Sequence, residues 1–231
     1  RRQRQMCIRD RIIIYHGSSE IVKQPVYGKG KPYNDYGIGF YCTEHLELAK
    51  EWACTKNIDG FVNEYELDLT HLKVLHLSEY SILHWLALLM VNRRFRISTP
   101  VMRRGFQWLK DNFLIDITGY DVIIGYRADD SYFSFARAFI NNEISLTQLS
   151  YAMKLGKLGE QIVLKSPKAF EEIRFLSYSV VDNTEYYAKR KSRDEEARAA
   201  FRAELDKEDI NGLYMRDILR EEVKKDDPRL Q

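Results

Sequence analysis

The feature that most constrains the fold is a β-branched run at residues 12–15 (Ile-Ile-Ile-Tyr), which stops at residues 16–19 (His-Gly-Ser-Ser). Such a run is typical of a buried strand, and the Gly-Ser pair after it is typical of a turn. The chain therefore has to place this segment in a sheet, with His16 at its end. A lone histidine is more often a hydrogen-bonded structural residue than a ligand contact, but its position before Gly-Ser favours the contact.

A second site-like segment follows an irregular loop. Residues 25–39 are rich in Gly, Pro, Asn and Asp, which is typical of a loop, and they lead into a predicted strand at residues 40–43. Thr43 is expected to cap a helix over 44–52. Gly37 and Gly39 permit a tight turn before Tyr41, and we expect Asp35 to stabilise that turn.

The rest of the chain predicts an α+β fold. Alternation of Tyr65, Leu67 and Leu69 with acidic residues indicates a half-buried strand. Further strands are expected at 121–125, 161–164 and 173–176, and helices at 133–139 and 146–155. We expect one domain over residues 12–182 with a helical insertion at about 79–116, and a charged helical C-terminal extension at 183–231.

Composition says little about partners. The formal charge of +2 arises from 36 basic and 34 acidic residues and requires neither nucleic acid nor a membrane. The longest apolar run, residues 82–91, is shorter than the roughly 20 residues that span a bilayer, so we expect no membrane segment. The three cysteines lack Cys-x-x-Cys spacing and favour a reducing compartment, so we expect the cytoplasm. Histidines and cysteines show no zinc spacing, so no metal is expected.

The first eleven residues form a basic segment without the apolar core or cleavage site of a secretory signal. Residues 1–11 are similar to the peptide produced when a sequencing adapter is translated at the edge of a contig. We expect them to be a non-native or disordered tail, so that the first structural residue is Ile12. A genuine basic tail is the alternative.

Three motifs in order resemble the His-Tyr-Glu signature of the ADP-ribosyltransferases, which include diphtheria toxin and the poly(ADP-ribose) polymerases. They lie at residues 15–18 (Tyr-His-Gly-Ser), 35–43 (Asp-Tyr-Gly-Ile-Gly-Phe-Tyr-Cys-Thr) and 160–164 (Glu-Gln-Ile-Val-Leu). The closer resemblance is to an uncharacterised bacterial family usually grouped with these enzymes, which also tends to carry Asp-Val-Ile-Ile-Gly followed by Ala-Asp-Asp, here 121–125 and 128–130. The resemblance covers residues 12 to about 176 and implies a split antiparallel β-sheet fold.

The resemblance also implies that NAD is the co-substrate. His16 is then expected to hydrogen-bond the adenosine ribose, and the backbone of Gly17 to hold the nicotinamide carboxamide. The ring of Tyr41 is expected to stack on nicotinamide and orient the leaving group. The binding residues expected are His16, Gly17, Ser18, Asp35, Gly39 and Tyr41, and the catalytic residues are His16, Tyr41 and either Glu160 or Gln161.

The third catalytic position is ambiguous between two neighbours. This residue is expected to bond the nicotinamide ribose and stabilise the oxocarbenium-like charge. The polymerase pattern selects Glu160, whereas the bacterial family favours Gln161, which supplies no charge and predicts slower or different chemistry. Adjacent strand residues face opposite sides, so only one can face the cleft. If Lys165 faces solvent, alternation slightly favours Glu160.

Other conspicuous residues have structural interpretations. Trp52 and Trp85 are assigned to packing. Asp129 and Asp130 are expected in a turn or helix cap, with paired carboxylates for metal or acid–base work as the alternative. The basic pairs and triplets of the helical segments are expected to be solvated helix faces, with contact to an anionic target as the minority interpretation.

Three functional hypotheses follow. The leading one is an NAD-dependent mono-ADP-ribosyltransferase that modifies an unidentified protein or nucleic acid, as a bacterial toxin or phage-defence effector that a partner protein could neutralise. The second is a catalytically silent ADP-ribosyltransferase fold that binds a nucleotide or a partner. The third is an RNA-modifying or RNA-binding protein that uses the basic helical surfaces, with salt-dependent RNA affinity independent of His16.

Overall fold

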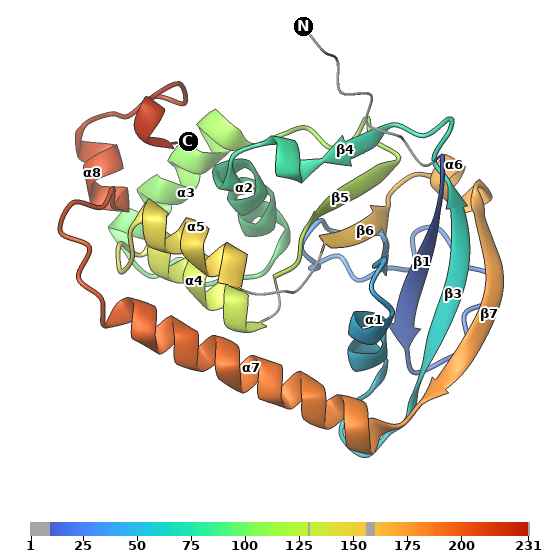
Figure 1. The fold of residues 1–231 in the computed structure, drawn as a ribbon. Helices are drawn as coiled ribbons and strands as arrows, with labels where there is room; N and C mark the ends of the chain where they lie inside the picture. The colour runs from blue at the N-terminus through green and yellow to red at the C-terminus, as the bar shows by residue number, and fades with distance from the viewer. Residues whose placement is uncertain (1–9, 129, 156–159, 231) are drawn as a thin grey trace, which may run out of the picture.

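The computed structural model describes residues 10–128, 130–155 and 160–230 (Figure 1). Most of the predicted N-terminal tail, together with Asp129, lies outside the described residues. Asp10 and Arg11 are exceptions. The carbonyl of Asp10 accepts the amide of Leu69 at 2.6 Å, and Arg11 begins β1 (Arg11–Ser18), where its Nε donates to the carboxylate of its paired residue Asp68 at 2.9 Å. The described structure therefore begins two residues before the expected Ile12.

Seven strands form two sheets in the described part of the chain. The first sheet has the order β1-β3-β7 and is antiparallel, with β3 at Gly60–Asp68 and β7 at Ile173–Val181. The second has the order β2-β6-β5-β4 and contains Phe40–Cys42, Glu160–Leu164, Val122–Tyr126 and Val74–His76 respectively. The sequence predicted a mixture of helices and strands correctly, but this sheet is mixed, because the unpredicted strand β4 pairs with β5 in parallel.

The two sheets pack face to face through apolar side chains. Ile14, Tyr65 and Leu67 of the first sheet meet Cys42, Val122, Ile162 and Leu164 of the second. A backbone bridge joins the sheets at one corner, where the amide of Tyr15 donates to Thr43 at 2.8 Å and the amide of Thr43 donates back at 3.0 Å. This bridge places the end of β1, which carries His16, beside β2, which carries Tyr41.

Helices cover the opposite face of the second sheet (Figure 1). Val163 and Ile123 of that face belong to a large core built with α2 (Ile82–Asn92), α3 (Pro100–Phe113), α4 (Asp130–Ile140) and α5 (Leu146–Leu155). Trp85 in α2 is 1% exposed, which confirms its assignment to packing. Both faces of β6 are thus covered, so a strand that looked half-exposed by alternation is buried on two sides.

The charged C-terminal segment packs against the rest of the molecule. Helix α7 (Asn183–Leu205) runs beneath the α4 and α5 pair and reaches α1 (Leu46–Ala53), as Figure 1 shows. The following helix α8 (Met215–Arg220) packs on α3, where Met215 fills the space beside Gly105. Short helices complete the described elements: η1 at Leu77–Glu79, α6 at Pro167–Glu171 and η2 at Pro228–Leu230.

The predicted cap of α1 was wrong. Helix α1 begins at Leu46 rather than at residue 44, and His45 occupies the cap position. Thr43 is held in the bridge to Tyr15, and its hydroxyl accepts the amide of His45 at 3.2 Å. Pairing with β1 therefore extends the strand conformation through Thr43 and delays the helix.

Candidate functional site

The first two motifs meet at a hydrogen bond between β1 and β2. Nδ1 of His16 lies 2.7 Å from the carbonyl oxygen of Tyr41, and because a carbonyl only accepts, Nδ1 carries the proton. The imidazole also packs on Phe40, with ring centroids 4.3 Å apart. Burial lowers the pKa of His16 and the bond to Tyr41 opposes this only in part, so the ring is a neutral donor that ties the two motifs together.

Tyr41 is locked by the loop that precedes it. Its hydroxyl donates to the carbonyl of Gly37 at 2.7 Å and accepts the amide of Tyr36 at 3.0 Å. Gly37 has a φ of 73°, a conformation that favours glycine, so the loop can close on the tyrosine. Burial raises the pKa of Tyr41, which keeps the phenol protonated as the donor to Gly37.

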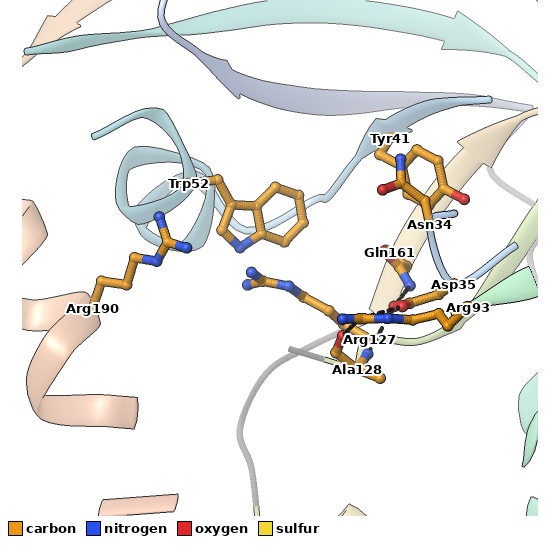
Figure 2. A pocket seen from close by; sticks show the side chains of 9 residues that line it. All are labelled: Asn34, Asp35, Tyr41, Trp52, Arg93, Arg127, Ala128, Gln161 and Arg190. Atoms are coloured by element: carbon orange, nitrogen blue, oxygen red, sulfur yellow. Dashed lines mark hydrogen bonds and ion pairs between the residues drawn. The ribbon is translucent and has the colours of Figure 1, made fainter. Parts of the chain in front are cut away.

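Tyr41 lines an open pocket of about 270 Å³ between the second sheet, α1 and α7, which we call the Tyr41 pocket (Figure 2). Its walls combine one carboxylate with three guanidinium groups and two aromatic rings. They comprise Asn34, Asp35, Tyr41, Trp52, Arg93, Arg127, Ala128, Gln161 and Arg190.

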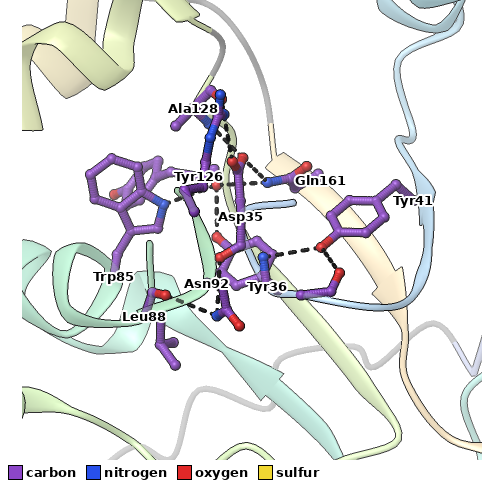
Figure 3. Close-up of polar contacts among 11 residues, drawn as sticks. Asp35, Tyr36, Tyr41, Trp85, Leu88, Asn92, Tyr126, Ala128 and Gln161 are labelled. Carbon is purple, nitrogen blue, oxygen red and sulfur yellow. Dashed lines mark hydrogen bonds and ion pairs between the residues drawn. The ribbon is translucent and has the colours of Figure 1, made fainter. Parts of the chain in front are cut away.

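Asp35 anchors the floor of the pocket (Figure 3). One carboxylate oxygen accepts Arg93 at 3.0 Å, and the other accepts the amide of Ala128 and the side chain of Gln161, each at 2.8 Å. The expectation that Asp35 stabilises its own turn was wrong, because that turn is closed by the amide of Gly37 donating to Asn34 at 3.0 Å. Asp35 instead ties the loop to α2, to the end of β5 and to β6.

One wall of the pocket is aromatic and cationic. The guanidinium of Arg127 lies 4.5 Å from the ring centroid of Trp52, and Arg190 reaches the same wall from α7 (Figure 2). The indole nitrogen of Trp52 is buried and has no hydrogen-bond partner among the described residues. An unpaired buried donor costs about 1–3 kcal/mol, so this nitrogen favours a ligand with an acceptor at this wall.

Gln161, and not Glu160, lines this pocket. Lys165, taken as solvent-facing, in fact donates to the carbonyls of Tyr36 and Ile38 at 2.6 and 2.5 Å, and burial lowers its pKa. The premise that selected Glu160 was therefore wrong. The face that Glu160 shares with Ile162 packs between the two sheets, whereas Gln161 lies on the face of Tyr41.

The remaining predicted residues lie outside the Tyr41 pocket. His16, Gly17, Ser18, Gly39 and Glu160 are not among its lining residues. A Cβ on Gly17 would lie 2.0 Å from the carbonyl oxygen of Ala49, so packing of α1 explains this glycine without a ligand.

Local hydrogen bonds and packing also account for Ser18 and Gly39 without a ligand. The hydroxyl of Ser18 donates to the carbonyl of Glu20 at 2.5 Å and accepts Asn63 at 3.1 Å, which stabilises the turn after β1. Gly39 is required by close packing on β6, since a Cβ would lie 2.6 Å from a methyl of Val163.

A family model described as "Protein of unknown function (DUF3990)" matches residues 12–175. The chain belongs to this family. Searches of curated proteins and of solved structures found no match. The DUF3990 segment contains every lining residue of the Tyr41 pocket except Arg190, which α7 supplies from beyond it.

Four residues that shape the Tyr41 pocket were not predicted from the sequence as site residues. Trp52 was assigned to packing because it shares helical spacing with Ala49 and Ala53, which gave no sign that its ring faces a cavity. Arg127 directly follows the end of β5, and strand-end placement was the one available signal. Arg93 directly follows the end of α2, and Arg190 lies on α7; nothing local in the sequence distinguishes either from a solvated charge.

Two of the expectations concern absences. No helix of the described residues combines the length and apolarity needed to span a bilayer. Within the same residues, no three His, Cys, Asp or Glu side chains gather as a metal site would require. Asp129 and the side chain of Asp130, expected in a turn or helix cap or alternatively as two catalytic or metal-binding carboxylates, lie outside the described part. Cys42 and Cys54 are buried free thiols, and burial raises the pKa of both.

Proposed function

We propose that this DUF3990 protein is an NAD-dependent mono-ADP-ribosyltransferase that modifies a macromolecule, and that its two packed sheets are the split sheet of that fold. The observation that carries the proposal is the meeting of Tyr41 and Gln161, from the second and third motifs, in one cationic and aromatic-walled pocket. The bond between His16 and Tyr41 attaches the first motif to the same place.

The composition of the Tyr41 pocket suits a dinucleotide. Tyr41 and Trp52 offer flat rings for stacking on nicotinamide or adenine. Arg127 and Arg190 offer planar donors that match pyrophosphate oxygens, and the unpaired indole nitrogen of Trp52 offers one more donor. A ligand that is both aromatic and anionic would therefore satisfy the two kinds of wall together.

Gln161 is the residue we place at the nicotinamide ribose. Its amide can hydrogen-bond a ribose hydroxyl and orient the sugar while the glycosidic bond breaks. Nicotinamide leaves with the bonding electron pair, the acceptor nucleophile attacks the oxocarbenium carbon, and its proton passes to solvent. Because Gln161 is uncharged, it cannot stabilise the oxocarbenium charge as a glutamate would, and turnover is expected to be slow.

A specific observation favours a catalytically silent, nucleotide-binding variant as the second candidate. The one carboxylate among the lining residues is Asp35, and Arg93 already neutralises it at 3.0 Å. The side-chain amide of Gln161 is also engaged, by Asp35 at 2.8 Å and by the carbonyl of Tyr126 at 3.2 Å. This alternative predicts binding of NAD without turnover.

Purified protein, incubated with labelled NAD and cell lysate, tests both candidates. Transfer of label or release of nicotinamide is expected from the wild type, and loss of both from Tyr41→Ala and Gln161→Ala. Glu160→Ala is the matched control, because the neighbouring side chain on the same strand lies outside the pocket.

Thermal unfolding with and without NAD separates the candidates. A ligand at one hundred times its Kd stabilises by about 2.7 kcal/mol. Stabilisation that Gln161→Ala removes, without transfer or nicotinamide release by the wild type, would select the silent variant. Absence of stabilisation as well as turnover would contradict the proposal.

A further inference from the structure

A second hollow adjoins the Tyr41 pocket along helix α7, and we call it the α7 hollow. It has a volume of about 270 Å³. It shares Arg127 and Arg190 with the Tyr41 pocket, so the two cavities are adjacent and meet at these side chains. Its lining residues are Glu51, Thr55, Lys56, Arg127, Tyr187, Arg190, Lys191, Arg193, Asp194 and Arg198.

Positive charge is concentrated in the α7 hollow. Six of its lining residues are cations and two are carboxylates, although the formal charge of the whole chain is only +2. Glu51 is neutralised by an ion pair with Arg193, and Asp194 by Arg198 at 2.8 Å. Lys191 pairs with Glu195 at 3.7 Å, a residue that does not line the hollow. Cations therefore outnumber carboxylates among the lining residues, which makes this a place of positive potential.

The cations of the hollow lie beside aromatic rings. Tyr187 is half-buried in the α7 hollow, and Trp52 lies across Arg127 in the adjoining pocket. Proteins that bind single-stranded nucleic acids commonly combine cations, which contact the phosphates, with aromatic rings, on which the bases stack. An acidic polypeptide would use the cations but leave the rings without a matching group.

We propose that the α7 hollow binds the phosphate backbone of a single-stranded nucleic acid. Because the two cavities meet at Arg127 and Arg190, a nucleotide of that strand would lie beside the Tyr41 pocket. Its role as the acceptor of ADP-ribose rests on the proposed function, whereas the binding itself does not. A concave hollow suits a flexible single strand better than a rigid duplex.

Fluorescence anisotropy with labelled oligo(dT) and oligo(rU) of equal length tests the binding. The variant is Lys56→Gln/Lys191→Gln, two exposed lysines of the hollow, and the matched control is Arg104→Gln/Lys110→Gln, two exposed cations of α3. We expect the first pair to weaken binding about tenfold and the control to leave it unchanged. The slope of log K against log salt should become shallower by about 1.4, since each phosphate contact on a single strand contributes about 0.7.

Three results would overturn the inference: no salt-dependent binding of either oligonucleotide, an equal loss in the α3 control, or competition by polyglutamate as strong as by oligonucleotide. Preference for dT or rU identifies the nucleic acid. If oligonucleotides bind but NAD does not stabilise the protein, the proposed function fails and the α7 hollow remains. If label transfers in lysate only to protein, and nuclease treatment changes nothing, the acceptor role is overturned.

Discussion

Gly17→Ala separates two explanations for the glycine of the first motif. The resemblance to ADP-ribosyltransferases implies that this glycine lets a ligand approach the backbone. The structure places α1 against it instead, since a Cβ would lie 2.0 Å from the carbonyl oxygen of Ala49 and 2.7 Å from the amide nitrogen of Ala53. Both are backbone atoms, so no side-chain rotation relieves the overlap, and α1 itself must move away from β1.

The cost can be worked from these distances. Overpacking a close-packed site costs about 1–3 kcal/mol, and a clash with two backbone groups belongs at the upper end. Replacing glycine restricts the unfolded chain and offsets about 0.4–1 kcal/mol. We expect Gly17→Ala to lower the free energy of unfolding by about 2 kcal/mol, which corresponds to about 4–8 °C in Tm for a chain of this size.

Urea and thermal unfolding, followed by circular dichroism, measure the effect. Gly119→Ala is the matched control, because a Cβ there has no atom within 4 Å and its φ is not in the left-handed region. We expect that control to stay within about 0.5 kcal/mol of the wild type. An unchanged urea midpoint for Gly17→Ala, together with loss of NAD binding, would refute the packing argument in favour of the ligand role.

Three other predictions concern the polar network, pH and the pocket wall. Asp35→Ala should lower the free energy of unfolding by about 3 kcal/mol, because Arg93 loses its buried acceptor. The double variant Asp35→Ala/Arg93→Met should recover part of this lost stability in urea titrations, and strictly additive losses would contradict the pairing. Burial lowers the pKa of His16, so the unfolded chain binds more protons than the folded chain, and stability falls as pH drops below about 6.5. His16→Gln should reduce this fall by up to about 1.4 kcal/mol per pH unit. Parallel curves of stability against pH for the wild type and the variant would disprove the prediction. Trp52→Leu should weaken NAD binding about tenfold in calorimetry because stacking is lost, with little change in the urea midpoint. Equal NAD affinity of the variant and the wild type would show that Trp52 is not part of the ligand site.

Sequence periodicity predicted the elements whose signal is local. The β-branched run at the start of β1 and the alternation in β3 depend on neighbouring residues, and both strands are present. Strand β4 has only three residues, too short for a period to be read, and it is held by pairing with β5. The start of α1 was misplaced for a related reason, since pairing of Thr43 with Tyr15 overrides its capping preference.

The candidate site was predictable only where motif residues carry it. Tyr41 and Asp35 were identified from their motifs and Gln161 as one of two alternatives, and the structure brings all three to one pocket. The sequence did not identify their partners, because Arg190 lies on a helix whose local pattern resembles any solvated face, and Arg93 follows the end of α2 without a local signal of its role.

The sequence by itself determined that His16 lies in a strand and that Tyr41 follows a glycine-rich loop, because both depend on short-range backbone preferences. The predicted turn at residues 17–18 was wrong, because pairing with β3 extends β1 to Ser18. Only the tertiary structure decided which of Glu160 and Gln161 faces the pocket. Strand alternation defines two faces but not which one borders a cavity, and β6 is covered on both sides. That choice depends on helices α2 to α5 on one face and the first sheet on the other, which are brought there by packing.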